Sequence, residues 1–382
     1  MHFSVSSFSL LQKLYFLHKI INTKYSLFKF KIFGKKLVIM VSDSENHLVT
    51  AEIQVYVKKT SEEKIAIHPK FMIEILKTFP NETIFIKKEK NTLNIYSEQG
   101  DYPIPIICHE KENRHHLTIF SSMENFEKGK ILKITLFSKI LLKILNKTLF
   151  ATGNEEIKPV MNGVFFRFSP KGSTFVATDT YKLVKYTLKN IKSNQYIEFV
   201  ISRKSLRILQ NILFNEKKSV TIEYKKTGIL KFSFETKTFL CELINEKYPD
   251  YNSVFPKKKD ISFIINRLFF LNSIKRISLL SKEETNFIRF NLIDNTLRIY
   301  EENTRISIFS KIRCKYIAEY FRDESIIKMG FNSKFLIEIL SSFKEDFVSF
   351  ELYSSNRMGI LKPFSSSKKE ESTLILIMSI IV

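Results

Sequence analysis

Glycine, proline, cysteine and tryptophan are all scarce in this sequence, which has 9 Gly, 9 Pro, 3 Cys and no Trp among 382 residues. The cysteines, Cys108, Cys241 and Cys314, lie far apart and form no CxxC pair. We therefore expect neither a disulfide framework nor a structural zinc site, and this usage fits a reducing cytoplasm. No G-x-G triplet occurs, which disfavours the glycine-rich turn that binds dinucleotides.

Histidine is missing from most of the chain, because all seven histidines lie between His2 and His116. The remaining residues offer no imidazole for a catalytic triad, a metal site or a general base. Tyr181 and Lys185 have the YxxxK spacing of short-chain dehydrogenases, but the glycine-rich turn that this chemistry needs is absent. We therefore expect no enzyme, no catalytic or metal-binding residues and no cofactor.

Long hydrophobic runs are missing too. No segment approaches the ~18 apolar residues of a membrane span, and the apolar C-terminal run LILIMSIIV has nine residues. The N-terminus lacks the basic region and the cleavage site of a signal peptide. The sequence therefore indicates a soluble, cytoplasmic protein with no membrane partner.

Acidic residues are outnumbered, because 61 Lys and Arg face 39 Asp and Glu, giving a formal net charge of +22. A basic surface attracts polyanions such as nucleic acid without reading their sequence. A chain rich in Lys, Phe and Ile and poor in Gly and Pro is also typical of AT-rich coding sequence. Both explanations of the charge stay open at this point.

The length exceeds one ordinary core, and an internal repeat indicates how the chain is divided. Three segments read as a strand, a polar cap and a helix: KIAIHPKFMIEILKTF, IEFVISRKSLRILQNIL and IIKMGFNSKFLIEILSSF. Their lysines, Lys70, Lys204 and Lys334, stand 134 and then 130 residues apart. The apolar residues after each lysine recur at the spacing of a helix with one buried stripe.

A second triplet lies between the first. Ser9, Ser138 and Asn266 each follow an alternating strand, and each can cap the helix that comes next. The segments after the helices alternate apolar and polar residues, as antiparallel strands do. Each unit therefore has two helices, about six in all, packed on one side of antiparallel sheets, which is an α+β fold. The repeat predicts three domains, residues 1–127, 128–256 and 257–382.

Three segments carry a resemblance to a known family. They are FATGNEEIKPVMNGVFFRFSPKGSTFVATDTYKLVKY from Phe150, CELINEKYPDYNSVFPK from Cys241 and MGFNSKFLIEIL from Met329. Together with the repeat, they make the chain resemble the bacterial DNA polymerase sliding clamp, the β subunit of the polymerase III holoenzyme. The resemblance covers nearly the whole chain and is weakest in the first domain. It implies three clamp domains per chain and a head-to-tail homodimeric ring with helices lining the hole.

The resemblance implies a processivity factor without chemistry of its own. Such a ring encircles double-stranded DNA regardless of sequence and tethers the catalytic subunit of the replicative polymerase, and a clamp loader opens it. The residues expected to face DNA are basic and lie on or beside the predicted helices or in one loop: Lys139, Lys143, Lys158, Arg203, Lys204, Arg207, Lys275 and Arg276. For each of them a solvated helix face remains the alternative.

Two further sites follow from the resemblance. A hydrophobic cleft between the second and third domains is expected to bind partner peptides. Its expected walls are Met161, Thr178, Thr180, Tyr181, Lys182, Leu183, Pro249, Val254, Gly359, Ile360, Met378, Ser379, Ile380, Ile381 and Val382. The C-terminal residues have an edge strand packed in the core as their alternative. The expected ring interface places Leu279 and Leu280 against Tyr102 and Ile104 of the next subunit.

A rival of a different class is a monomeric basic protein that binds nucleic acid or a ribonucleoprotein through an open sheet or helix face. Topology separates the two. A ring on nicked circular DNA survives high salt and leaves after linearisation, whereas a surface binder loses affinity steeply with salt on either form.

Overall fold

The structure is a computed structural model of the chain. It describes all residues except 22, 24–25, 60–64, 108–130, 155–157, 226–227, 257–260, 281–285, 294, 303–306, 319–328, 354–357, 365–369 and 380–382. Three predicted cleft residues, Ile380, Ile381 and Val382, therefore lie outside the described residues. The chain forms two compact units: unit 1 comprises Met1–Leu142 and Lys204–Leu243, and unit 2 comprises Lys143–Arg203 and Ile244–Val382.

The described residues contain six α-helices, which confirms the predicted number. They are α1 (Ser7–Ile20), α2 (Pro69–Thr78), α4 (Ser138–Thr148), α5 (Arg203–Leu213), α6 (Arg267–Leu280) and α7 (Ser333–Ser342). Two short 3-10 helices are η2 (Leu149–Ala151) and η3 (Pro159–Asn162).

The predicted helix caps are correct in one case of three. Asn266 caps α6, because its Oδ1 accepts the N–H of Phe269 at 3.0 Å. Ser9 is not the cap of α1, since the helix starts two residues earlier and Ser6 Oγ accepts the N–H of Ser9 at 3.3 Å. The Ser138 hydroxyl instead donates to the carbonyl of Lys218.

Unit 1 contains two antiparallel sheets, with strand orders β5-β1-β7-β8-β9 and β10-β15-β16-β17-β4-β3-β2-β6. The first sheet comprises β1 (His2–Ser6), β5 (Tyr56–Lys59), β7 (Thr83–Glu89), β8 (Thr92–Ser97) and β9 (Gly100–Pro105). The second comprises β2 (Phe28–Phe33), β3 (Lys36–Ser42), β4 (Leu48–Gln54), β6 (Ile65–Ile67), β10 (Leu132–Phe137), β15 (Ser219–Lys225), β16 (Ile229–Ser233) and β17 (Lys237–Glu242). Phe239 of β17 lies opposite Val49 of β4, so this sheet runs from the middle third of the chain into the first.

Unit 2 is built on one antiparallel sheet of twelve strands, in the order β14-β11-β12-β13-β25-β24-β23-β18-β21-β20-β19-β22. The strands are β11 (Gly163–Ser169), β12 (Gly172–Thr178), β13 (Lys182–Leu188), β14 (Ile197–Ser202), β18 (Ile261–Asn266), β19 (Phe287–Ile293), β20 (Thr296–Glu302), β21 (Ser307–Ala318), β22 (Met329–Asn332), β23 (Phe347–Tyr353), β24 (Met358–Pro363) and β25 (Glu371–Met378). Leu183 of β13 lies opposite Leu376 of β25, which joins the middle and last thirds of the chain.

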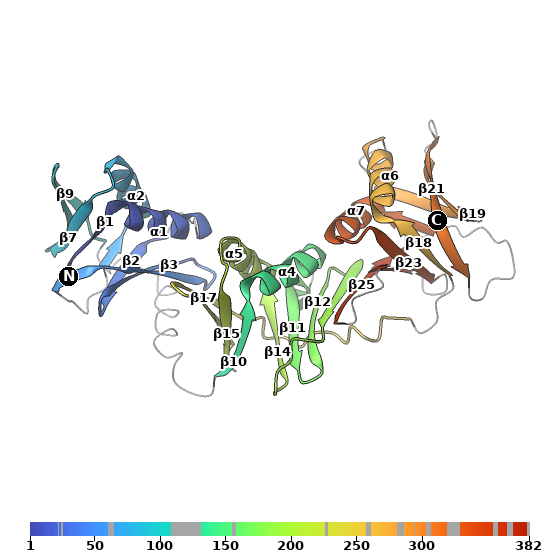
Figure 1. The fold of residues 1–382 in the computed structure, drawn as a ribbon, viewed down its shortest axis with the longest axis horizontal. Coiled ribbons are helices and arrows are strands. Elements are labelled where there is room, and N and C mark those ends of the chain that lie inside the picture. Colours follow the sequence, from blue (N-terminus) through green and yellow to red (C-terminus); the bar gives the residue numbers. More distant parts are fainter. Residues whose placement is uncertain are drawn as a thin grey trace. The chain divides into compact units, whose positions relative to one another are not determined.

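Helices α1 and α2 lie side by side in unit 1, as do α6 and α7 in unit 2 (Figure 1). The buried stripe of α1 consists of Leu10, Leu14 and Leu17, each with no exposed surface. Burying such a leucine stabilises the fold by about 1.5–3 kcal/mol. Among the described residues, no helix combines the length and the apolar character that crossing a bilayer requires.

Candidate functional site

The β12–β13 turn in unit 2 is held by the side chain of Asp179. Its Oδ1 accepts the N–H groups of Tyr181 at 3.0 Å and of Lys182 at 2.8 Å. Thr178 Oγ1 donates to the carbonyl of Lys182 at 2.9 Å and accepts the N–H of Thr180 at 3.1 Å. Thr180 has a φ of 78°, a strained conformation for a β-branched residue. These bonds give the turn a defined shape.

Two consecutive residues of this turn contact α7. Tyr181 stacks on Phe335 with the ring centroids 6.1 Å apart, yet remains 60% exposed. Lys182 is 4% exposed, and its Nζ lies 4.0 Å from the centre of the Phe335 ring. The same Nζ pairs with Asp179 at 2.6 Å and with Glu338 at 3.1 Å. A buried ammonium requires such compensation, so Lys182 holds the turn on α7, while Tyr181 presents its ring to solvent.

The strands beside the turn align three apolar residues. Leu183 lies opposite Leu376 of β25, and Leu376 lies opposite Ile360 of β24. Gly359 precedes Ile360 and packs on Phe350, where an added Cβ would come within 2.3 Å of the ring carbon Cε2. The absence of a side chain at Gly359 is therefore explained by packing.

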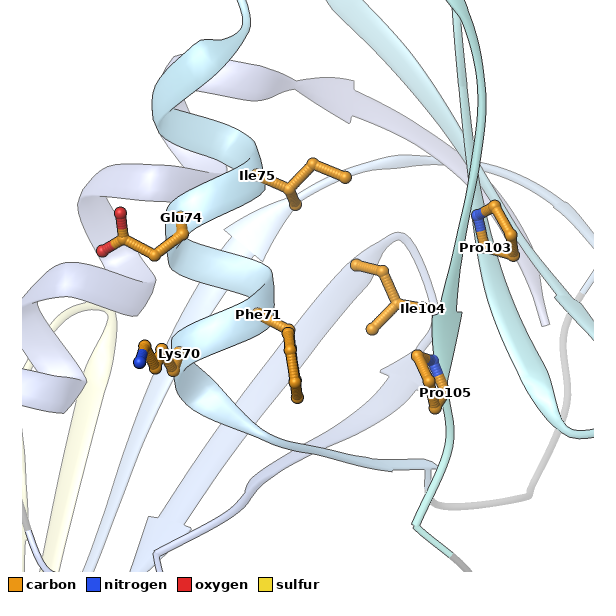
Figure 2. Close-up of a pocket in the computed structure, with 7 residues that line it drawn as sticks. All are labelled: Lys70, Phe71, Glu74, Ile75, Pro103, Ile104 and Pro105. Atoms are coloured by element: carbon orange, nitrogen blue, oxygen red, sulfur yellow. The ribbon is translucent and has the colours of Figure 1, made fainter.

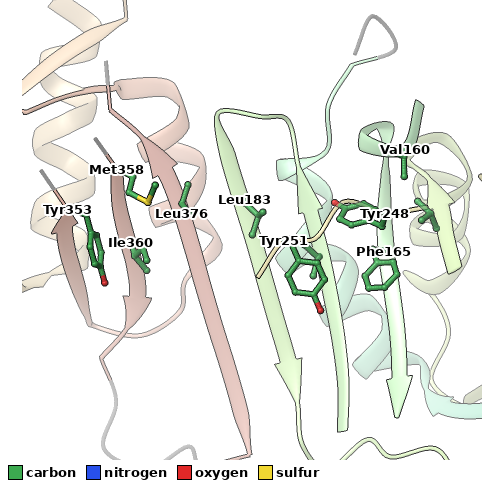
Figure 3. Packing of buried hydrophobic residues seen from close by; sticks show 11 residues of the cluster. Val160, Phe165, Leu183, Tyr248, Tyr251, Tyr353, Met358, Ile360 and Leu376 are labelled. Carbon is green, nitrogen blue, oxygen red and sulfur yellow. The ribbon is translucent and has the colours of Figure 1, made fainter. Parts of the chain in front are cut away.

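These strands form part of a buried apolar group, the Tyr248 cluster. Figure 3 shows Leu183 and Leu376 on neighbouring strands, with Tyr251 next to Leu183 and Tyr248 next to Phe165. The cluster consists of Val160, Phe165, Val176, Leu183, Val200, Tyr248, Tyr251, Tyr353, Met358, Ile360 and Leu376. Met161 of η3 packs against it. Burial raises the pKa of Tyr248, whose hydroxyl has no hydrogen-bond partner among the described residues.

Apolar side chains remain exposed beside this cluster. Val254 is 44% exposed and Met378 is 37% exposed. Pro249 is exposed, and Ser379 is partly buried. The structure thus brings the described cleft residues of the β12–β13 turn, η3, β24 and the end of β25 to one region of unit 2, and it leaves several of their apolar groups in contact with solvent.

The predicted DNA-facing residues divide into two groups. Five are exposed, and one of these, Arg276, also donates to Ser273 Oγ at 2.9 Å; the five are Lys139, Lys158, Arg207, Lys275 and Arg276. The other three are engaged by protein groups. Lys143 pairs with Glu371 at 2.5 Å, and Arg203 donates to Asn154 Oδ1 at 3.0 Å. Lys204 is exposed but forms an ion pair with Glu45.

A pocket of about 320 Å³ lies between α2 and β9 in unit 1 (Figure 2). It is lined by Lys70, Phe71, Glu74, Ile75, Pro103, Ile104 and Pro105. Phe71 and Ile75 project from the helix toward Ile104, and Phe71 is 61% exposed. Tyr102 and Ile104 are the residues predicted for one side of the ring interface, and Ile104 lines this pocket. Tyr102 instead packs edge-on against Phe79, 5.3 Å between centroids.

The other predicted interface residues end α6. Leu279 is 83% exposed and Leu280 is 68% exposed, so both present nearly their whole side chains to solvent. The two adjacent side chains form an exposed apolar patch at the end of α6.

Sequence reasoning missed several residues of these sites. The sequence indicated Phe335 only as one apolar residue of a helical stripe. In the structure its ring contacts both Tyr181 and Lys182. The pairing of Glu45 with Lys204, 159 positions apart, had no sequence signal. No group of three or more His, Cys, Asp or Glu residues that could hold a metal ion occurs in the described parts of the chain.

Two family models match the chain. The central domain of the DNA polymerase III beta subunit matches residues 135–250, and the C-terminal domain of the same subunit matches residues 252–378. The chain is 26% identical over 251 residues to the beta sliding clamp of Staphylococcus aureus. This alignment covers 65% of the chain and 63% of the staphylococcal protein, so the chain spans less than two thirds of that relative. The Staphylococcus epidermidis beta sliding clamp is 26% identical over 249 residues, with 65% and 63% covered.

Solved structures match the whole chain in fold. The DNA polymerase III subunit beta from Pseudomonas aeruginosa superposes with a TM-score of 0.85 at 20% identity, covering 100% of both chains. The DNA polymerase sliding clamp from Bacillus subtilis gives a TM-score of 0.84 at 18% identity, covering 100% of this chain and 99% of the other. The α+β clamp fold that the resemblance implied is therefore confirmed.

Proposed function

Because the chain belongs to the family of bacterial DNA polymerase III β subunits, the sliding clamps, we propose that it is a processivity factor in DNA replication. It encircles duplex DNA as a ring and tethers the replicative polymerase, and it has no catalytic chemistry of its own. The tether works through effective concentration, because a polymerase bound to a ring that stays on DNA rebinds faster than it diffuses away.

The observation that carries this proposal is the charge of the helices. Four of the six described helices, α1, α4, α5 and α6, contain no Asp or Glu, and each contains at least two Lys or Arg. A chain biased only toward lysine by its coding sequence would still place acids on these helices. Acid-free helices suit a surface that follows phosphates without reading bases.

The partner site proposed is the surface around the Tyr248 cluster. Exposed Tyr181, Val254 and Met378 beside buried Leu183 and Ile360 favour an apolar segment of another protein. A short peptide from the polymerase catalytic subunit or from the clamp loader is the occupant that the family suggests.

The proposed ring closes through two copies of the chain, head to tail. Leu279 and Leu280 of one copy fill the pocket formed by Phe71, Ile75 and Ile104 of the other. Exposed leucines on one element and an apolar pocket of about 320 Å³ on another support this pairing.

Three clamp domains with boundaries near 127 and 256 remain part of the proposal, and the family matches at 135–250 and 252–378 support the second boundary. We place the protein in the cytoplasm. The buried free thiols of Cys241 and Cys314 fit a reducing compartment.

Retention on circular DNA tests the proposal. The protein, loaded onto nicked circular duplex, should resist a high-salt wash and should be released when the circle is cut. Loss from the intact circle and from the linear form at the same salt concentration would favour the rival, a monomeric surface binder.

A further inference from the structure

The β3–β4 turn of unit 1 is organised by one carboxylate. Asp43 Oδ1 accepts the backbone N–H groups of Glu45 and of His47, both at 3.0 Å. The N–H of Asp43 donates to the carbonyl of His47 at 3.1 Å, which closes the turn. Asn46 has a φ of 62°, a left-handed conformation that asparagine tolerates. The conformation of the turn, and with it the direction of Glu45, is therefore fixed locally.

His47 joins this turn to α5. Its Nδ1 lies 2.8 Å from Asp43 Oδ2, and its Nε2 lies 2.8 Å from Ser205 Oγ. Its ring stacks on Phe239 with 6.1 Å between centroids. Carboxylate, imidazole and hydroxyl follow one another as in a hydrolytic triad. Ser205 is only 1% exposed, however, so its hydroxyl cannot reach a substrate, and the arrangement positions the turn.

The hydrogen bond between His47 and Ser205 places Glu45 beside Lys204, the residue before Ser205. Glu45 forms an ion pair with Lys204, and the two side chains are 49% and 53% exposed. Asn46 Nδ2 donates to Glu242 at 2.8 Å, a second tie between the turn and the end of β17. An acid from the first third of the chain is thus held against a basic residue of an acid-free helix.

We propose that Glu45 competes with DNA phosphate for Lys204, and that Asp43, His47 and Ser205 are the positioning residues that keep it there. The inference rests on the proposed function, since it concerns how tightly the DNA-facing helices hold the duplex. A half-exposed ion pair is weak enough for a phosphate to displace it.

The competition has a measurable signature in salt. A lysine that neutralises one phosphate releases condensed cations, and each such contact contributes about −0.9 to the slope of log K against log salt. While Lys204 pairs with Glu45 instead of a phosphate, that phosphate keeps its condensed cation. Lys204 therefore adds little to the slope while Glu45 is present, and it adds its full share once Glu45 is neutralised.

The experiment measures binding of a labelled DNA duplex by the full chain across a series of salt concentrations. Glu45→Gln should make the slope steeper by about 0.9 relative to the wild type. The matched control is Glu235→Gln, which removes the same charge from an ion pair of similar exposure in unit 1, Glu235 with Lys218 at 2.6 Å. If Glu235→Gln made the salt slope steeper by the same amount, the change in net charge alone would explain the effect of Glu45→Gln. That result would overturn the proposal.

Two further variants separate positioning from folding. Ser205→Ala removes the partner of His47 Nε2 and should steepen the slope in the same direction as Glu45→Gln, an effect that a purely structural role would not produce. In a variant that already carries Lys204→Gln, adding Glu45→Gln should leave the slope of log K against log salt unchanged, because the lysine for which Glu45 competes is absent. A wild type that binds DNA with a slope unaffected by Glu45→Gln overturns this inference alone. A wild type that does not bind duplex DNA overturns the proposed function and this inference together.

Discussion

The backbone N–H of Met378 donates a 2.8 Å hydrogen bond to the carbonyl oxygen of Tyr181. This bond joins the end of β25 to the β12–β13 turn, and the side chains of Tyr181 and Met378 are 60% and 37% exposed. A peptide lying across this junction would contact both residues, and their backbones are already held in place. Such preorganisation lowers the entropy lost on binding.

The first prediction concerns this junction. Tyr181→Ala should weaken binding of a polymerase-derived peptide by about 30-fold, the ~2 kcal/mol of a hot-spot aromatic. Isothermal titration of the peptide measures the change. Tyr196→Ala is the matched control, because Tyr196 is 68% exposed in the same unit and lies outside the proposed site. Similar affinities for the two variants would contradict the assignment.

A second prediction concerns the acid-free helices. Replacing both Lys275 and Arg276 of α6 by Gln should make the slope of log K against log salt shallower by roughly 1.8, or about 0.9 per lost phosphate contact. Binding to duplexes of different sequence should fall to the same extent. Lys171→Gln, on the exposed β11–β12 turn, serves as the comparison and should leave the slope nearly unchanged.

The third prediction concerns ring closure. Leu279→Asp places a charge where the proposed interface is apolar, and an unpaired buried charge is costly. Light scattering should then report the 45.0 kDa mass of one chain instead of twice that value. Phe214→Asp, at a site with 80% exposure at the end of α5, should leave the mass of the assembly unaltered. A dimeric Leu279→Asp variant would exclude this interface.

The fourth prediction concerns acid stability. Burial raises the pKa of the Asp43 carboxyl, but the hydrogen bonds from His47 and from the N–H of Glu45 outweigh burial and hold that pKa below its ordinary value of 3.8. The ionised carboxylate therefore stabilises the fold fully above about pH 4, and this contribution disappears as the pH falls through the lowered pKa.

Asp43→Asn should accordingly lower the thermal midpoint at pH 7 and have a smaller effect at pH 3. Thermal unfolding followed by circular dichroism at both pH values measures the difference. Asp101→Asn, at an exposed position, should change neither midpoint appreciably. An equal loss at both pH values would show that Asp43 acts through shape alone.

A fifth prediction tests the packing beneath β24. Gly359→Ala should destabilise unit 2 by about 1–3 kcal/mol, because the new Cβ overlaps the Phe350 ring. Phe350→Leu in the same chain should recover part of that loss by shortening the opposing side chain. Denaturant unfolding of the single and double variants gives the coupling, and strictly additive effects would rule out the contact.

Local patterns in the sequence were enough to predict the helices and the repeat. The buried stripe of α1 and the cap at Asn266 depend on neighbours within a few residues, where periodicity is informative. Lys182 shows where this approach stops. The resemblance implied a cleft wall at Lys182, but no local pattern indicated that its side chain is buried. Phe335 and Glu338, more than 150 positions away, contact it.

The sequence did not predict which segments make up each of the two units, because this too depends on contacts between residues far apart in the chain. A repeat indicates where similar segments begin, but it carries no information about which strand edges meet. The pairing of β17 with β4 places residues 237–240 beside residues 48–51, and that of β13 with β25 joins segments equally remote. Only the structure shows that the middle third is shared between two compact units.

That pairing of β17 with β4 also affects how the chain is made. During synthesis at about 5–20 residues per second, the N-terminal segment emerges first. The ribosome must add some 190 residues after Val49 before Phe239 is made and β17 can pair with the edge of β4. For that interval an unpaired strand edge is open to other nascent chains. The chain is therefore most exposed to aggregation through this edge during synthesis, before the second third of the chain is complete.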